Sequence, residues 1–399
     1  MNIGIDLRGL NYMPLTGINT YTIHFLYCLS NIKYNHPNMH FTAIGLQSDV
    51  YDKISLEYPF IYKLFERRIT TSQYFGFQKL AIPQLLLSIF TIFKIRVTKN
   101  LNWANCISFD LILQPQPKPL LKNEKSNLLV VFHDIYSAIN TSTMSFKQRI
   151  LENAYSYRII AKASRYIFAN SISTAMDLKN LLKIEEFKIQ LVYPAKPIWK
   201  AFSNKQVQPK YNKTIIPSER YMLCVSGIEP RKNWINILKA FKYTQQKNDS
   251  SGYHLVLVGR IVDEKYYKTL ILLIKSLDIK NVTFHLDLNQ EEKHELYQNC
   301  DFLLYPSFYE GFGFPIIEAL EYEKPVITSK ISSMPELAKE SGLYVNPLNY
   351  LEIASAMEIL QKDRMFYQYL VNSIDVDKIK YSWNELEIAL EKILKFDEI

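Results

Sequence analysis

The sequence predicts an α/β protein built from two doubly wound domains, each a parallel sheet covered by helices on both faces. Short apolar runs alternate with longer amphipathic segments along most of the 399 residues. This alternation stops at a stretch rich in Pro, Lys and Asn, residues 194–220, and then restarts, as expected of a linker between two domains. The length also exceeds what a single ordinary hydrophobic core contains.

The first half contains five expected strands, each a short run of apolar residues followed by a helical pattern. Amphipathic spacing predicts helices over residues 18–32 and 147–163. We place the first domain at residues 1–200. Its expected strands are Ile3–Leu7, His40–Gly45, Phe109–Leu113, Asn127–Phe132 and Tyr166–Asn170.

The second half repeats this arrangement, and we place the second domain at residues 201–399. Helical spacing follows its first two strands, over residues 233–246 and 265–277. In an open parallel sheet the ligand binds at the carboxyl ends of the strands, so we expect a cleft there. The expected strands are 221–227, 254–259, 281–286, 300–305, 324–329 and 342–346.

Charge is distributed unevenly along the chain. The net charge is +8, but residues 1–200 hold 23 Lys and Arg against 12 Asp and Glu, which makes this half +11, and the remainder is −3. A basic half indicates an anionic partner such as a membrane surface, nucleic acid or an acidic substrate. A nucleic-acid-binding protein is therefore one alternative. Against it, the basic residues are scattered and no recognition module is visible.

The remaining compositional features favour a cytoplasmic protein, with attachment to a membrane limited to its surface. The four cysteines lie far apart without a CxxC pair, which is typical of buried thiols in a reducing compartment. The chain begins with a strand pattern, so we expect no signal peptide. The most apolar segment, Leu80–Phe93, is shorter than the ~20 residues of a spanning helix. A buried helix is expected there, with a membrane-facing or dimer-forming helix as the alternative.

The segment YPSFYEGFGFPIIEAL, residues 305–320, carries the strongest functional signal. It predicts a strand, a glycine-containing loop and a helix whose free N–H groups and positive dipole end favour a diphosphate. Pro315 suits the first turn of that helix. Glu310 and Glu318 would then accept hydrogen bonds from sugar hydroxyls of the same ligand, which indicates a nucleotide sugar. Two solvated glutamates beside a turn are the alternative interpretation.

A second cationic element, VSGIEPRKNW, follows the first strand of the second domain. Arg231 and Lys232 lie at the carboxyl end of that strand, where paired cations suit a diphosphate. Asn233 is expected to cap the next helix. Two solvated charges at a helix start are the alternative.

Two weaker signals lie in the first domain. Gly17 opens a helix after the first strand, where a glycine invites phosphate contact, although GxGxxG is absent. His133 ends a strand in VVFHDIY, where it can contact a sugar hydroxyl or move a proton. A lone histidine at a strand end is otherwise a structural residue.

Together these motifs resemble the retaining glycosyltransferases of family four, which have the GT-B fold of two Rossmann-like domains. The resemblance is strongest from Tyr221 to Pro347, through VSGIEPRKNW, YPSFYEGFGFPIIEAL, KPVITSKISSMPEL and GLYVNPLN. The first domain matches more loosely, through IGIDLRGL, TGINTY, VFHDIY and ANSISTAMDL. The sequence departs from the family pattern at three places: Ser226, HLDL near His285, and VYPAKP at the start of the linker.

The resemblance implies roles for individual residues. The first domain would bind the acceptor and the second the donor, and the last helix, about 380–398, would cross back to the first domain. Arg231 and Lys232 would hold the donor diphosphate, and Glu318 the ribose hydroxyls. Contacts to the donor sugar and phosphates would come from Glu310, Gly311, Phe312, Gly313 and Phe314. Gly17 would close over the diphosphate, and His133 would lie near the sugar.

The expected activity is transfer of a hexose, mannose favoured, from a nucleotide-diphosphate sugar to a glycan or lipid-linked acceptor in surface polysaccharide or lipopolysaccharide assembly. The family retains anomeric configuration, and the site segments contain no Asp-x-Asp motif, so no metal or other cofactor is expected. A nucleotide-sugar epimerase of the same fold is the alternative within this class. The donor base and sugar, the acceptor, the linkage and the oligomeric state cannot be read from the sequence.

Overall fold

The computed structural model describes residues 1–11, 17–69, 109–117, 126–139, 157–195, 215–247, 252–286, 288–375 and 381–396. Two compact units divide the chain, one formed by Met1–Lys205 with Tyr381–Ile399, the other by Gln206–Lys380. The segment Leu80–Phe93, most of the predicted helix 147–163 and the middle of the predicted linker lie outside the described residues.

Unit 1 is built on a seven-stranded parallel sheet in the order β3-β2-β1-β4-β5-β6-β7. Five of its strands match the predicted ones, and the two edge strands β3 and β7 have three residues each, too few to show an apolar pattern. The strands are β1 Asn2–Asp6, β2 His40–Ile44, β3 Arg67–Ile69, β4 Leu111–Gln114, β5 Asn127–Phe132, β6 Tyr166–Ala169 and β7 Ile189–Leu191.

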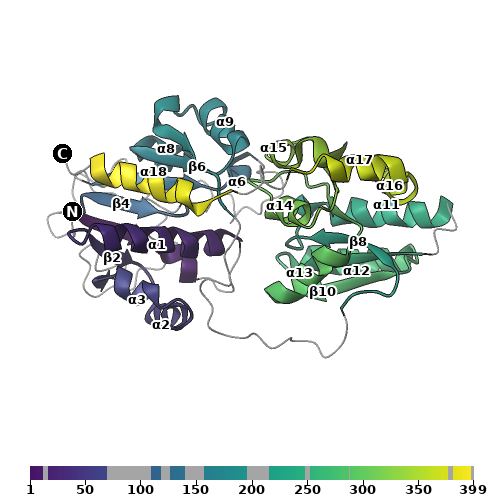
Figure 1. Ribbon diagram of the computed structural model, residues 1–399, viewed down its shortest axis with the longest axis horizontal. Coiled ribbons are helices and arrows are strands. Elements are labelled where there is room, and N and C mark those ends of the chain that lie inside the picture. The colour runs from purple at the N-terminus through teal and green to yellow at the C-terminus, as the bar shows by residue number, and fades with distance from the viewer. Residues whose placement is uncertain are drawn as a thin grey trace. The chain divides into compact units, whose positions relative to one another are not determined.

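Helices cover both faces of this sheet (Figure 1). One face packs against α1, α2, α3 and the C-terminal helix α18, which lies beside α1 although they are far apart in sequence. The other face packs against α8 and α9. The helices are α1 Gly17–Asn35, α2 Ser48–Glu57, α3 Phe60–Leu64, α6 Tyr136–Ile139, α8 Tyr157–Ala163, α9 Ile172–Asn180 and α18 Trp383–Phe396, with 3-10 turns η1 Arg8–Asn11 and η3 Glu186–Lys188.

Unit 2 holds a six-stranded parallel sheet in the order β10-β9-β8-β11-β12-β13. All six strands agree with the predicted segments to within a few residues, which confirms the predicted fold class. The strands are β8 Arg220–Val225, β9 Tyr253–Gly259, β10 Val282–Leu286, β11 Phe302–Tyr305, β12 Val326–Ser329 and β13 Gly342–Val345.

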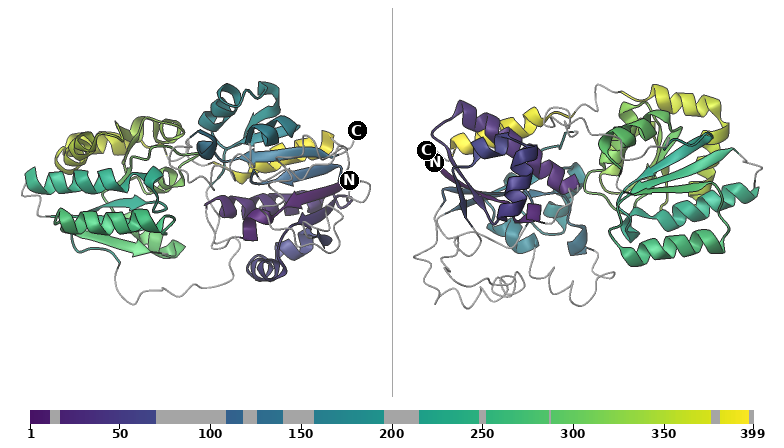
Figure 2. Two further views of the ribbon diagram at one scale, coloured as in Figure 1. Left: turned by 180° about the vertical axis from the view of Figure 1, so that it is seen from behind. Right: turned by 90° about the horizontal axis from the view of Figure 1, so that it is seen from below.

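The helices of unit 2 also enclose their sheet from two sides (Figure 2). The core between the sheet and helices α11, α12, α16 and α17 includes the fully buried Trp234. The helices are α11 Trp234–Lys247, α12 Glu264–Ser276, α13 Gln290–Asn299, α14 Phe314–Glu321, α15 Met334–Ala338, α16 Tyr350–Lys362 and α17 Arg364–Asn372, with 3-10 turns η4 Pro230–Lys232 and η5 Lys339–Ser341. Within the described residues, no helix combines the length and apolarity needed to cross a membrane.

Candidate active site

The candidate site lies where the strand order of unit 2 reverses. From β8 the chain adds β9 and β10 on one side, and β11 then returns to pair with the other side of β8. The loops that follow β8 and β11 therefore emerge next to each other at the carboxyl edge of the sheet. This is the position at which open α/β sheets bind their ligands.

Asn233 ties the two loops together. Its backbone is left-handed, with φ of 64°. Its side-chain nitrogen Nδ2 donates to the carbonyl oxygens of Pro306 at 2.9 Å and Pro347 at 2.7 Å. The expectation that this side chain caps α11 is therefore replaced by a bracing role. Below it, the indole nitrogen of Trp234 donates to Ser226 Oγ at 2.7 Å, so the serine that departs from the family pattern fixes the start of the β8 loop.

The two predicted cations both meet Glu310. Lys232 Nζ lies 2.7 Å from each carboxylate oxygen of Glu310, and Arg231 Nη1 lies 3.2 Å from one of them. The same Arg231 atom donates to the carbonyl oxygen of Tyr309 at 3.0 Å, and Nη2 donates to Glu229 at 2.9 Å. The loop after β11 thus holds both cations of the loop after β8 in fixed positions.

Burial makes this cluster electrostatically strong. Glu310 is only 4% exposed. Its burial favours the neutral acid, but the charges of Lys232 and Arg231 outweigh that effect and lower the pKa of the carboxyl. Burial lowers the pKa of Lys232, and the Glu310 charge opposes this. The carboxylate therefore organises the cations, and its predicted contact with the donor sugar stays a prediction.

The backbone of the glycine loop is shaped for the start of α14. Gly313 has φ of 120°, a region that side chains rarely adopt, and Pro315 lies in the first turn as predicted. Phe312 and Phe314 pack edge to face at 5.1 Å between ring centroids. Gly311 and its neighbours thus lead directly to the N-terminus of α14, where the positive end of the helix dipole favours an anion.

Two serines that the sequence analysis did not single out hold this loop. Ser332 Oγ accepts the backbone N–H of Glu310 at 2.9 Å. The hydroxyl of Ser333 is buried and donates to the carbonyl oxygens of Glu310, at 3.1 Å, and Phe312. Their signal was present in the quoted motif KPVITSKISSMPEL, where two serines precede a Pro-containing helix start.

Glu318 lies on α14 and is half-buried, whereas Glu310 is almost fully buried. Burial raises the pKa of Tyr297 well above its usual value, and the neighbouring Glu318 charge raises it further. The corresponding neighbour of Glu310 is Tyr305, whose pKa is raised in the same way. The structure thus places each glutamate beside its own buried tyrosine, and the ribose contact of Glu318 stays a prediction.

The two predicted residues of unit 1 differ in accessibility. Gly17 begins α1, and a Cβ built on it meets open space. His133 is buried, donates from Nε2 to the carbonyl oxygen of Pro115 at 2.8 Å, and packs edge to face on Tyr21 at 4.7 Å. Burial lowers the pKa of His133. These contacts match the structural alternative for this histidine, and its role at the sugar stays a prediction.

A buried ion pair at the switch point of the first sheet was also missed. Arg8 Nη2 lies 2.7 Å from Asp6 Oδ2 at the end of β1, and Gln114 Nε2, at the end of β4, donates to the same oxygen at 2.9 Å. Both charged residues stand in the quoted segment IGIDLRGL. The spacing of two residues gave no reason to expect a fork-shaped contact between them.

No group of three or more metal-binding side chains occurs among the residues that the structure describes. The chain does contain one Asp-x-Asp triplet, Asp375–Asp377. It follows α17 and belongs to neither loop of the candidate site, and Asp377 lies outside the described residues.

Known proteins resemble this chain both in sequence and in fold. Residues 208–374 match the family of glycosyl transferases group 1. The serotype-specific mannosyltransferase WbdA of Escherichia coli is 28% identical over 192 residues, which are 48% of this chain and 23% of WbdA. The O-antigen chain mannosyltransferase RfbU of Salmonella typhimurium is 28% identical over 247 residues, 61% of this chain and 62% of RfbU. The chain thus spans between about a quarter and three fifths of these relatives.

The fold extends the comparison to the whole chain. The crystal structure of HepE from Anabaena, solved in complex with UDP-glucose, superposes with a TM-score of 0.65 at 15% identity and covers 99% of both chains. The two parallel α/β units therefore have the GT-B fold. Residues 208–374, which form most of unit 2, match the group 1 glycosyltransferases.

Proposed function

We propose that this protein transfers a hexose, mannose favoured, from a nucleotide-diphosphate sugar to a glycan or lipid-linked acceptor during assembly of a surface polysaccharide. The names of its relatives support the sugar and the pathway, because WbdA and RfbU are mannosyltransferases and RfbU acts on an O-antigen chain. The net charge of +11 on residues 1–200 supports a location at the anionic inner face of a cell membrane.

The contact of Lys232 and Arg231 with Glu310 is the observation that carries the proposal. Two cations and a helix start converge at the carboxyl edge of the sheet, where a diphosphate meets two positive charges and the positive end of a helix dipole. A carboxylate that is 4% exposed fixes the cations before any ligand arrives. Such fixed charges cost no reorganisation during the reaction.

The proposed reaction retains the anomeric configuration by a front-face displacement. The bond from the anomeric carbon to the phosphate oxygen breaks with both electrons leaving on the diphosphate. The acceptor hydroxyl forms the new bond on the same face and passes its proton to the leaving diphosphate oxygen. Lys232 and Arg231 stabilise the charge that develops there, and losing one such contact raises the barrier by about 2–4 kcal/mol. No metal ion is needed in this scheme, so EDTA should leave the rate unchanged.

A titration of purified protein with GDP, UDP, dTDP and ADP, and with their common sugars, tests the proposal. A nucleotide that binds the folded state raises the melting temperature by mass action. We expect one of them to do so, GDP first, and Glu318→Ala to weaken that shift if Glu318 holds the ribose. If none of the nucleotides shifts the melting temperature or releases heat in calorimetry, the donor site is assigned wrongly.

The epimerase alternative is decided by products. Incubation of the protein with a bound nucleotide sugar and no acceptor would yield an epimerised nucleotide sugar from an epimerase, whereas a transferase leaves the sugar unchanged until acceptor is added. The nucleic-acid alternative is tested by filter binding of the protein to nucleic acid at several salt concentrations. Specific phosphate contacts would make this binding strongly salt-dependent, so retention that does not change with salt would exclude this alternative.

A further inference from the structure

One segment of unit 1, residues 172–191, carries several large apolar side chains that are exposed. On α9, Ile172 and Met176 are 46% and 56% exposed, one helical turn apart on the same face. Thr174 and Leu178, on the opposite face of the helix, are fully buried. The helix is therefore apolar on its outward face as well as on its inward face, which its packing on the sheet does not require.

The exposed apolar surface continues beyond the helix. Leu181 is 52% exposed directly after α9, Phe187 on η3 is 85% exposed, and Leu191 on the edge strand β7 is 39% exposed. Isolated exposed apolar residues are ordinary. Here five large ones occur within 20 residues, and we call them, with the lysines between them, the α9–β7 surface.

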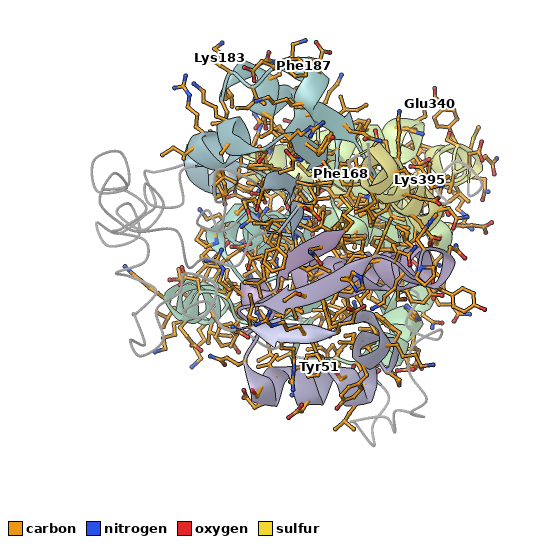
Figure 3. All side chains as sticks on the ribbon, turned by 90° about the vertical axis from the view of Figure 1, so that its left-hand side faces the viewer. Tyr51, Phe168, Lys183, Phe187, Glu340 and Lys395 are labelled. Atoms are coloured by element: carbon orange, nitrogen blue, oxygen red, sulfur yellow. The ribbon has the colours of Figure 1, made fainter. Side chains whose placement is uncertain are left out.

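Contacts within the segment hold these elements together. Lys179, at the end of α9, lies 2.5 Å from Glu186 on η3. The N–H of Ile184 donates to the carbonyl oxygen of Leu178 at 3.2 Å, and α9 packs against β7. Figure 3 shows Lys183 and Phe187 at the upper margin of unit 1, both pointing away from the ribbon.

The same stretch of the chain is rich in basic residues. Between Tyr157 and Leu191 there are six Lys and Arg against three Asp and Glu. Glu185 and Glu186 are paired with Lys188 and Lys179, so these four charges balance one another, and the stretch keeps a net charge of +3. The basic residues are Arg158, Lys162, Arg165, Lys179, Lys183 and Lys188, and all but the half-buried Lys188 are exposed.

We propose that the α9–β7 surface docks unit 1 onto an anionic lipid membrane. Apolar side chains on a helix face and on turns insert at the interface, and lysines beside them meet anionic headgroups while their stems cover apolar surface. A protein partner fits less well, because protein interfaces are depleted in lysine at their core. The surface also lacks the continuous apolar area of a homodimer contact, since lysines separate its members.

This inference deepens the proposed function. It rests on that function in one respect, namely that a lipid-linked acceptor is presented at a membrane. Docking itself needs neither donor nor acceptor. It can therefore be measured apart from transfer, and transfer to a soluble glycan can be measured apart from docking.

The test uses the full chain with vesicles of phosphatidylcholine alone or with about one third phosphatidylglycerol. The test variant is Phe187→Ser with Lys183→Gln. The matched control is Met365→Ser with Lys268→Gln on unit 2, which also removes one apolar side chain and one exposed lysine. Met365 and Phe187 are equally exposed, at 85% each. Both variants change the net charge equally.

Co-sedimentation should show binding to the anionic vesicles that weakens with salt and is much lower on neutral vesicles. The test variant should lower the partition coefficient at least about tenfold, while the control binds like the parent and all three proteins retain nucleotide binding. The proposal is overturned if the parent does not bind anionic vesicles or if the test variant binds them as tightly as the parent. A concentration-dependent dimer in sedimentation equilibrium, lost in the test variant, would also overturn it in favour of contact between copies.

Discussion

Lys232 Nζ lies 2.7 Å from both carboxylate oxygens of Glu310, although the two residues are 78 positions apart in sequence. The lysine comes from the loop after β8 and the glutamate from the loop after β11, neighbouring strands of unit 2. Their side chains are 10% and 5% exposed. A buried ion pair thus joins the two loops that the proposed diphosphate must contact.

Replacing Lys232 with Met should therefore affect both stability and activity. The variant leaves Glu310 with a single cation at 3.2 Å, that of Arg231, and an undercompensated buried charge costs about 3 kcal/mol or more of folding free energy. Activity should fall at least 100-fold, because one contact to the leaving group is lost. Urea unfolding and steady-state kinetics measure the two effects.

A second substitution separates the two roles of the lysine. In the double variant Lys232→Met with Glu310→Gln the buried carboxylate is gone, so most of the folding free energy should return, while turnover should stay low. If turnover recovers together with stability, Lys232 serves only the structure of the loops and its assignment to the diphosphate is wrong.

The sequence was sufficient for the fold because the second sheet consists of buried strands with continuous apolar runs, such as Phe302–Tyr305. Arg231 and Lys232 could be placed at a strand end for the same reason. The pairing of Arg231 and Lys232 with Glu310 could not be predicted. It depends on which strands are neighbours in the sheet, and strand order is set by tertiary packing. Asn233 shows the same limit, because a helix-start pattern gave no sign of carbonyl partners in two distant loops.

Gly259 should tolerate no side chain. It ends β9, and a Cβ built there would lie 1.9 Å from the carbonyl oxygen of Ser226, a backbone atom at the start of the β8 loop. Gly259→Ala should destabilise the protein by about 3 kcal/mol and weaken nucleotide binding by moving that loop. Gly252→Ala is the control, because a Cβ there meets nothing within 4 Å; equal melting temperatures for the two variants would refute the prediction.

Gly17→Ala tests whether the glycine at the start of α1 serves a ligand. A Cβ at this position meets open space within the protein, and alanine favours helix, so the melting temperature should be unchanged or higher. If a phosphate approaches the Gly17 backbone, the added methyl group should raise KM for the donor about tenfold, or about 1.4 kcal/mol. An unchanged KM would show that Gly17 only begins the helix.

His24 makes the attachment of α18 sensitive to acid. Its ring is 1% exposed and stacks on Trp383, the first residue of α18, at 4.6 Å between centroids. Burial lowers the pKa of His24 from 6.5 to about 4, although a bond to the Thr20 carbonyl opposes this. Because the folded pKa is the lower one, the unfolded chain binds more protons between about pH 6.5 and pH 4, and stability falls as the pH drops through that window.

The loss from this one histidine should approach about 3 kcal/mol at pH 4, at roughly 1.4 kcal/mol for each pKa unit. His24→Phe keeps an aromatic ring against Trp383 but cannot bind a proton, so it should be similar to the parent at pH 7.5 and more stable than the parent below pH 5. Urea unfolding of both proteins at pH 7.5, 5.5 and 4.5 measures the difference, in which the titration of all other groups cancels. Parallel stability curves would mean that His24 titrates alike in the folded and unfolded chain and does not link pH to the docking of α18 on α1.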